Sequence, residues 1–195
     1  MRWLWTMGGG QIVGNIITGS RVDTINNSGT ITGDINLGSS NDTYAGSGNG
    51  LVSGTIFGER GTDTLTGGAL GDKIDGGANE DSIDGAAGDD NLLGDTGNDT
   101  ILAGTGDDTV FGGSNDDLIR GGSGDHQLNR DDGADTIVGG SGDDIISGGD
   151  DADFVQARAD DGFVDGDDVM HGGRVRTTLR AAPAMTNSTA LAATT

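Results

Sequence analysis

The chain has no cysteine, a single proline and only 4% aromatic residues among its 195 residues. The lack of cysteine excludes a disulfide framework, and the lack of aromatics argues against an ordinary globular core. Positive charge is also scarce, with 10 lysines and arginines against 32 acidic residues and a net charge of −22. A field of that sign repels nucleic acid and anionic lipid, so the expected partners are cations and nucleic acid is not expected.

Long hydrophobic runs and catalytic motifs are missing as well. The opening MRWLWTM is too short for the apolar region of a Sec-type signal or for a membrane span, so we expect neither. No HExxH, GxSxG or P-loop occurs, and paired carboxylates such as Asp143 and Asp144 recur at fixed positions, which favours a scaffold over acid–base chemistry. The sequence therefore predicts no catalytic residues and no enzyme.

Glycine and aspartate dominate the chain, in a fixed order. There are 40 glycines, and Glu59 and Glu80 are the only glutamates among the acidic residues. Residues 58–156 divide without gaps into eleven nonapeptides, of which GGSGDDIIS, residues 139–147, is the most regular. Such a short period indicates a solenoid rather than a globular domain.

The eighth position of each nonapeptide is aliphatic throughout. Three residues centred on it, bounded by glycine-rich turns, suit a short strand. Two nonapeptides then form one coil with two strands, and successive coils stack in parallel about 4.8 Å apart. We expect an all-β parallel β-roll, or β-solenoid, with calcium ions in its turns. The side chains expected to face inward are Leu65, Ile74, Ile83, Leu92, Ile101, Val110, Ile119, Leu128, Ile137, Ile146 and Val155.

The sixth position is aspartate in every nonapeptide but one. Stacking places these carboxylates one rung apart, and calcium takes oxygen ligands at about 2.4 Å, so an ion between two rungs can bridge them and complete its shell with turn carbonyls. Glycine lets the turn aim those carbonyls at the ion. The predicted metal ligands are Asp63, Asp72, Asp81, Asp90, Asp99, Asp108, Asp117, Asp135, Asp144, Asp153 and, in a later half motif, Asp168. The turn glycines predicted to contribute are Gly94, Gly104, Gly106, Gly112, Gly121, Gly139, Gly140, Gly142 and Gly148.

GGSGDDIIS matches the pattern GGxGxDxUx, and the repeat region resembles the RTX calcium-binding β-roll proteins. The resemblance covers about half the chain. It implies several bound Ca²⁺ ions, type I export from a Gram-negative bacterium and folding outside the cell, where calcium is plentiful. It therefore predicts a secreted, extracellular protein.

Three departures from the motif stand out. His126 occupies a carboxylate position, where it is either a transition-metal ligand or, as we prefer, the result of repeat decay that weakens the sites shared with Asp108 and Asp144. Arg130 and Asp131 replace a glycine pair, which predicts a strained or bulged rung. Leu70 stands where left-handed backbone is expected, which leucine tolerates poorly.

The remaining segments carry weaker signals. Residues 1–9 are expected to be an unstructured start, and residues 10–57 a wider β-solenoid with repeats of about 19 residues, similar to bacterial secreted β-helical exoproteins. There Asp23 and Asp42 either bind calcium or, with better odds, stabilise turns. Residues 157–173 form a decayed repeat, and residues 174–195 a flexible tail that is also the place for a secretion signal.

Two functions remain open at this level. The first is a structural or adhesive protein that folds on calcium uptake and contacts cell-surface or matrix components. The second is a non-catalytic secretion module of a larger exported enzyme or toxin. Ice binding is disfavoured, because the third positions of the repeats form no regular row of threonine or asparagine.

Overall fold

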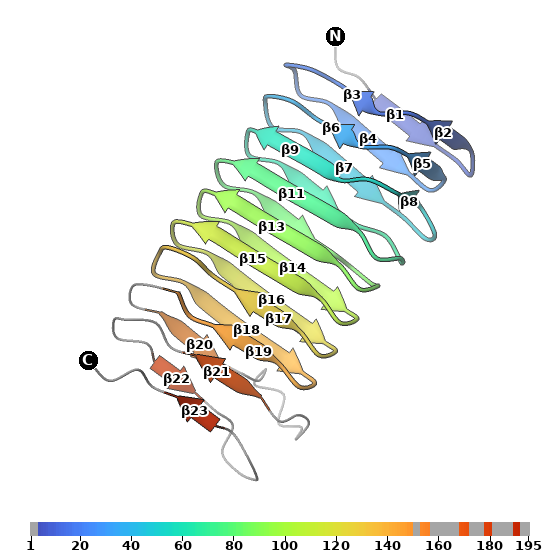
Figure 1. Ribbon diagram of the computed structural model, residues 1–195. Helices are drawn as coiled ribbons and strands as arrows, with labels where there is room; N and C mark the ends of the chain where they lie inside the picture. Colours follow the sequence, from blue (N-terminus) through green and yellow to red (C-terminus); the bar gives the residue numbers. More distant parts are fainter. Residues whose placement is uncertain (1–3, 150–152, 157–167, 172–177, 181–188, 192–195) are drawn as a thin grey trace.

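The computed structural model describes residues 4–149, 153–156, 168–171, 178–180 and 189–191. Of the predicted unstructured start, residues 4–9 are described, and Leu4–Met7 form a strand instead. Most of the predicted flexible tail and of the decayed repeat lies outside the described residues. Within them every regular element is a β-strand, and the strands wind into a stack of parallel coils (Figure 1). The all-β parallel solenoid expected from the sequence is confirmed.

Two long sheets run the length of the stack, each built from one strand per coil. Sheet 1 has the order β1 (Leu4–Met7), β4 (Thr24–Asn27), β7 (Thr43–Gly46), β10 (Thr64–Thr66), β12 (Ser82–Asp84), β14 (Thr100–Thr105), β16 (Leu118–Ser123), β18 (Thr136–Ser141), β20 (Phe154–Gln156) and β22 (Thr178–Arg180). Sheet 2 comprises β3 (Ile16–Ile17), β6 (Ile35–Asn36), β9 (Ile56–Arg60), β11 (Lys73–Ala78), β13 (Asn91–Thr96), β15 (Thr109–Ser114), β17 (Gln127–Asn129), β19 (Ile145–Ser147), β21 (Val169–His171) and β23 (Thr189–Leu191).

The first coils carry a third, short sheet. It consists of β2 (Gln11–Val13), β5 (Thr30–Thr32) and β8 (Leu51–Val52), which lie between sheets 1 and 2 on one side of the stack (Figure 1). In these coils, paired residues are more than 18 residues apart, the length of two nonapeptides. Ile25 pairs with Tyr44, and Tyr44 pairs with Leu65. From Leu65 onward the advance is 18 residues, as in the pair Leu65 and Ile83, so a two-sided roll follows the wider coils.

The core of the roll consists of aliphatic side chains that point inward from the two long sheets. Every eighth-position residue from Leu65 to Val155 is at most 2% exposed, which confirms the inward position. The neighbours on either side point outward, as in β14, where Ile101 is fully buried and Leu102 is exposed. Strand alternation places one large residue per nonapeptide in the core and leaves the rest of each strand at the surface.

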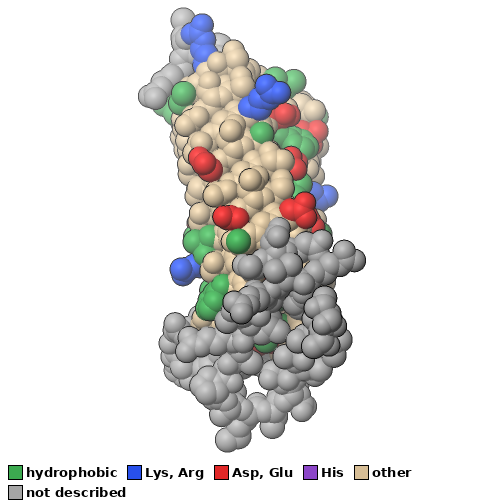
Figure 2. All heavy atoms as spheres, turned by 90° about the vertical axis from the view of Figure 1, so that its left-hand side faces the viewer, with side chains coloured by type: hydrophobic (Ala, Val, Ile, Leu, Met, Phe, Trp, Pro, Cys, Tyr) green, Lys and Arg blue, Asp and Glu red, His purple; other side chains and the backbone are tan. Residues whose placement is uncertain are grey.

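Two edges connect the sheets, and they are named here by the turns that form them. Edge 1 contains the turns that lead from sheet 2 to sheet 1, such as residues 58–63 and 94–99. Edge 2 contains the turns that lead from sheet 1 to sheet 2, such as residues 85–90 and 139–144. The surface of edge 1 is mostly backbone and uncharged side chains, with isolated acidic groups (Figure 2), although the chain carries 32 acidic residues. Within the described residues, twelve aspartates are buried.

Candidate metal centre

The sixth-position aspartates form two buried ladders, one along each edge. On edge 1 the backbone N–H of each aspartate donates to Oδ1 of the aspartate one coil further on, for example Asp63 to Asp81 at 2.7 Å and Asp99 to Asp117 at 2.8 Å. The predicted ligands in this ladder are Asp63, Asp81, Asp99, Asp117, Asp135 and Asp153. On edge 2 the ladder holds Asp72, Asp90, Asp108, Asp144 and Asp168, with His126 between Asp108 and Asp144.

The second carboxylate oxygen of most ladder members has no protein partner. Within the described residues, Oδ2 of Asp63, Asp81 and Asp90 is buried and accepts no hydrogen bond, and the same holds for Asp99, Asp117 and Asp144. A buried anionic oxygen without a partner is costly, because neither water nor a donor compensates for its lost hydration. These oxygens are therefore the donor atoms that an inserted cation would satisfy.

Nine of the eleven first positions are glycine, and the missing side chain lets that oxygen and a neighbouring carbonyl approach the backbone closely. A Cβ added to Gly76 would lie 2.8 Å from Oδ2 of Asp81 and 3.0 Å from the carbonyl oxygen of Gly94, one coil further on. An equivalent pair of oxygens lies close to four other first-position glycines. One is the carboxylate oxygen of the same turn, and the other is the first-position carbonyl oxygen of the next coil. These glycines are Gly58, Gly67, Gly85 and Gly94. Oxygen donors converge on a space that a side chain would fill, which suits a hard cation such as calcium.

The other predicted glycines play a conformational part. Gly104 and Gly140 at the second position, and Gly106 and Gly142 at the fourth, have φ between 114° and 126°. Gly94, Gly112 and Gly121 occupy first positions beside the ladder side chains, and Gly139 and Gly148 are buried first-position residues. The second position also holds Glu59, Ala86 and Asp95 at φ of 73° to 76°, a left-handed backbone that is strained for residues other than glycine.

Burial changes the protonation of the ladder when no cation is present. It raises the pKa of Asp81, Asp90, Asp117 and Asp144 to about 7, with repulsion from neighbouring carboxylates adding to the effect. It likewise raises the pKa of Asp63 and Asp99 to about 6. A bound divalent cation acts in the opposite direction, because it favours the ionised carboxylate.

The turn at Leu70 is built differently from the others. Leu70 lies outside the left-handed region, and the N–H of Gly68 donates to Oδ2 of Asp72 at 2.7 Å. This turn stacks on the last wide coil, where the N–H of Ala69 donates to the carbonyl of Gly48. The leucine is tolerated because the neighbouring coil imposes another turn geometry.

His126 interrupts the edge 2 ladder without leaving it. It is 1% exposed, its Nδ1 accepts from the N–H of Asp108 at 3.3 Å, and it lies 3.4 Å from Oδ2 of Asp108. Burial lowers the pKa of His126, which favours the neutral ring. Within the described residues no second histidine joins it in a metal-binding group, so a transition-metal site gains no support.

Asp23 and Asp42 extend the edge 1 ladder into the wide coils. The N–H of Asp23 donates to Asp42, and the N–H of Asp42 to Asp63, both at 2.6 Å. The residue that faces Gly58 in this coil is Leu37, which is fully buried. An apolar side chain thus fills the position that glycine leaves open, which favours the turn-stabilising role for Asp42.

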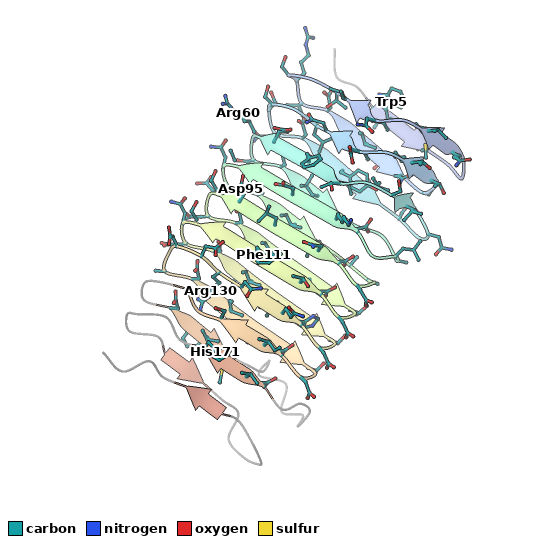
Figure 3. All side chains as sticks on the ribbon, in the orientation of Figure 1. Trp5, Arg60, Asp95, Phe111, Arg130 and His171 are labelled. Atoms are coloured by element: carbon teal, nitrogen blue, oxygen red, sulfur yellow. The ribbon has the colours of Figure 1, made fainter. Side chains whose placement is uncertain are left out.

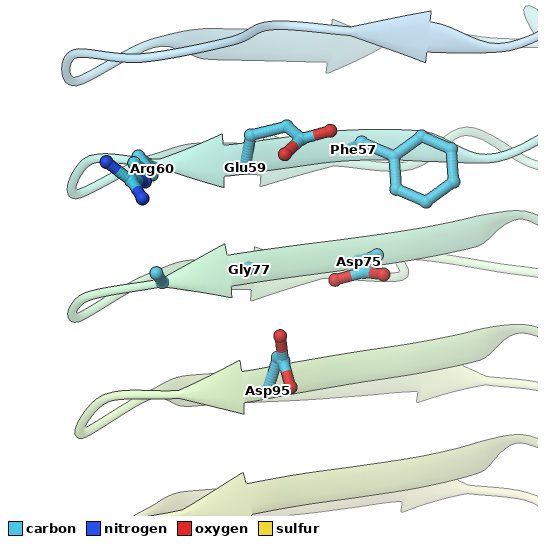
Figure 4. A pocket seen from close by; sticks show the side chains of 7 residues that line it. Phe57, Glu59, Arg60, Asp75, Gly77 and Asp95 are labelled. Atoms are coloured by element: carbon cyan, nitrogen blue, oxygen red, sulfur yellow. The ribbon is translucent and has the colours of Figure 1, made fainter.

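A shallow hollow on the outer face of sheet 2 is another place where carboxylates gather. Glu59 and Asp95 approach Asp75 from the coils on either side (Figure 4), and burial with their repulsion raises the pKa of Asp75 to about 6. Among the described residues no group of three or more metal-binding side chains has the geometry to hold an ion by itself. Any metal centre here therefore depends on backbone carbonyls, which the turns of the two edges supply.

Parallel coils with aspartate ladders and glycine-lined spaces define a calcium-binding β-roll. The model of the RTX calcium-binding nonapeptide repeat matches residues 57–92, 66–101, 93–125 and 130–164, which together span more than half the chain. The chain belongs to this family, and the resemblance noted from the sequence is confirmed. Comparisons with curated proteins and with solved structures find no match. Within the described residues no helix is long and apolar enough to cross a membrane.

Proposed function

We propose that this protein is an exported calcium-binding scaffold that folds as it takes up calcium outside the cell and serves a structural or adhesive role there. The observation that carries the proposal is the row of buried Oδ2 atoms that lack partners and lie beside first-position glycines, as in Asp63, Asp81, Asp90, Asp99 and Asp117. Several ions are expected, because this arrangement recurs along both edges. Family membership supports calcium as the metal, and RTX repeats typically occur in secreted proteins.

Electrostatics connects metal binding to folding. Carboxylates repeat from coil to coil along each ladder, except at His126, and the core offers only one large aliphatic residue per nonapeptide against their repulsion. An unfolded chain separates these charges, whereas a calcium-bound roll neutralises them, so binding free energy becomes folding free energy. Sites of about 10⁻⁴ to 10⁻³ M affinity fill outside cells and stay empty at cytosolic calcium concentrations.

We propose no catalytic role. In the acidic pairs at the fifth and sixth positions of the repeat, the second residue is a ladder aspartate and the first is its exposed neighbour. The exposed neighbours form a second row of hydrogen bonds, such as the one from the N–H of Asp107 to Asp89 at 3.0 Å. An alternative function is a non-catalytic module of a larger exported enzyme or toxin. It is supported by the first coil, where Leu4, Val13 and Ile17 are 70 to 78% exposed and would be covered by a further coil or partner.

The test is far-UV circular dichroism of the chelator-treated chain titrated with calcium, with magnesium as the control ion. We expect a cooperative coil-to-β transition with calcium alone. A strong β signal in chelator would instead mean that packing is sufficient and that calcium is an accessory.

One pair of variants isolates the ladder from general charge effects. Asp90→Asn removes the charge of a carboxyl that is 3% exposed, whereas Asp89→Asn makes the same change on its exposed neighbour. Asp89 accepts a hydrogen bond from the N–H of Asp107, and Asn98 accepts the equivalent bond from the N–H of Asp116. Asparagine therefore fits the position of Asp89. We expect Asp90→Asn to raise the calcium midpoint roughly tenfold and Asp89→Asn to leave it nearly unchanged. Equal shifts would show that calcium responds only to net charge.

A further inference from the structure

Arg130 is a buried cation inside the edge 1 ladder. Its side chain is fully buried, with Nη1 3.3 Å from Oδ1 of Asp153 and 3.9 Å from Oδ2 of Asp135. Figure 3 shows Arg130 at the same edge of the stack as Asp95, among the turns that lead into sheet 1. Buried arginines of this kind require anionic partners, because guanidinium stays charged in proteins.

The origin of the side chain explains why it reaches the ladder. Arg130 occupies the first position of its nonapeptide, which is glycine in the edge 1 turns at Gly94 and Gly112. A Cβ placed on Gly94 meets Oδ2 of Asp99 at 2.5 Å and also the carbonyl of Gly112. A side chain that starts at this position therefore grows directly into the space between the carboxylate of its own turn and the next coil.

The backbone around Arg130 keeps the register of the neighbouring coil. Strand β17 ends at Asn129, one residue before Arg130, while its neighbour β15 continues to Ser114. The register is kept, since Phe111 pairs with Asn129 and Ser114 with Asp132. Of the strained or bulged rung expected from the sequence, no bulge forms between these pairs.

The ladder itself is longer at this coil. The hydrogen bond from Asp135 N–H to Asp153 measures 3.2 Å, against 2.6 to 2.8 Å for the others on edge 1. The coils of Asp135 and Asp153 therefore make a longer ladder hydrogen bond where the Arg130 side chain contacts both carboxylates.

We propose that Arg130 permanently takes the place of a calcium ion between the coils of Asp135 and Asp153, so that this interval of edge 1 binds no calcium. The guanidinium supplies a positive charge to the two carboxylates that would otherwise coordinate the ion, and its bulk occupies the position that is glycine in other turns. A second cation in that space would meet the charge of the first. The inference rests on the proposed calcium binding at the other intervals.

Replacing the arginine should create a calcium site. Arg130→Gly changes the turn to GDDGAD, which closely resembles the natural edge 1 turn GDTGND at residues 94–99. Native mass spectrometry of the full chain at saturating calcium should count one more ion for Arg130→Gly than for the wild type. Arg120→Gln, which removes one exposed positive charge, should leave the count unchanged.

A measurement on the wild-type chain guards against a variant that does not fold. In crystals of the calcium-loaded protein, anomalous difference maps should show peaks at glycine-lined intervals and no peak between Asp135 and Asp153. A peak there, or an unchanged ion count in folded Arg130→Gly, would overturn the inference while leaving calcium binding intact. A wild-type chain that takes up no calcium would refute the proposed function, and this inference with it.

Discussion

At the scale of single residues, the residue five positions before a ladder carboxylate decides what lies beside that carboxylate. Glycine leaves the space open, Leu37 fills it with an apolar side chain, and Arg130 fills it with a cation. The identity of one residue per turn therefore sets whether an interval suits calcium.

Gly94→Ala tests this role of the first position. The added methyl would press on Oδ2 of Asp99 and on the carbonyl of Gly112, so we expect the coil to shift at a cost of about 1–3 kcal/mol and the calcium midpoint to rise roughly tenfold. Isothermal titration calorimetry measures the change. Gly10→Ala is the control, because a Cβ there meets no atom within 4 Å. If the two variants behave alike, the open space has no role in binding.

At the scale of the strand, alternation separates core from surface within three residues. In β14 (Thr100–Thr105) Ile101 is fully buried and Leu102 is 39% exposed, although both are aliphatic. Each strand is hydrogen-bonded to strands of the coils before and after it, so the central residue of every strand packs between two equivalent ones. The core is thus continuous along the stack, and damage in one coil affects its neighbours.

Ile101→Ala and Leu102→Ala form a matched pair for this element. We expect Ile101→Ala to lower the free energy of unfolding of the calcium-loaded roll by about 2–4 kcal/mol, because it leaves a cavity in the file of side chains. Leu102→Ala should change it by no more than about 0.5 kcal/mol. Denaturant unfolding at fixed calcium gives both values. A larger loss for Leu102→Ala would indicate that the outer face of sheet 1 is covered by another surface.

At the scale of the whole molecule, charge opposes the fold unless it is neutralised. The ladders bring together carboxylates from coils 18 residues apart, and burial raises the pKa of Asp81, Asp90, Asp117 and Asp144 to about 7. Between pH 4 and pH 7 the folded, calcium-free chain therefore binds more protons than the unfolded chain does. Its stability falls as pH rises through this window and is regained when calcium replaces the protons.

The prediction is that the calcium-free chain shows more β structure at pH 5 than at pH 8, as measured by far-UV circular dichroism in chelator. His126 has the opposite effect on the pH dependence of stability, because burial lowers its pKa. It is a single group, whereas at least four aspartates have a raised pKa. Calcium affinity should correspondingly fall as pH is lowered below about 7. Identical spectra at pH 5 and pH 8 would mean that ladder protonation does not control the fold.

The sequence by itself determined the period, the parallel coils and the inward-facing residues. It could do so because nine residues repeat with one aliphatic position each, and such a period fits only a short strand and a turn. It also identified the ladder aspartates, since a sixth-position residue stacks on its equivalent two repeats later. The finer expectation, that these side chains and the turn glycines coordinate calcium, stays a prediction with the tests given above.

The tertiary structure decided what happens where the repeat departs from its pattern. Only stacking shows that Asp42 continues the edge 1 ladder with Leu37 beside it, and that Leu70 is accommodated by a turn built on the preceding coil. Arg130 looked like a defect in a glycine pair, because its partner Asp153 lies in the next coil and a linear motif does not record that contact. These features depend on which coil lies against which, and that is set by packing between residues distant in the chain.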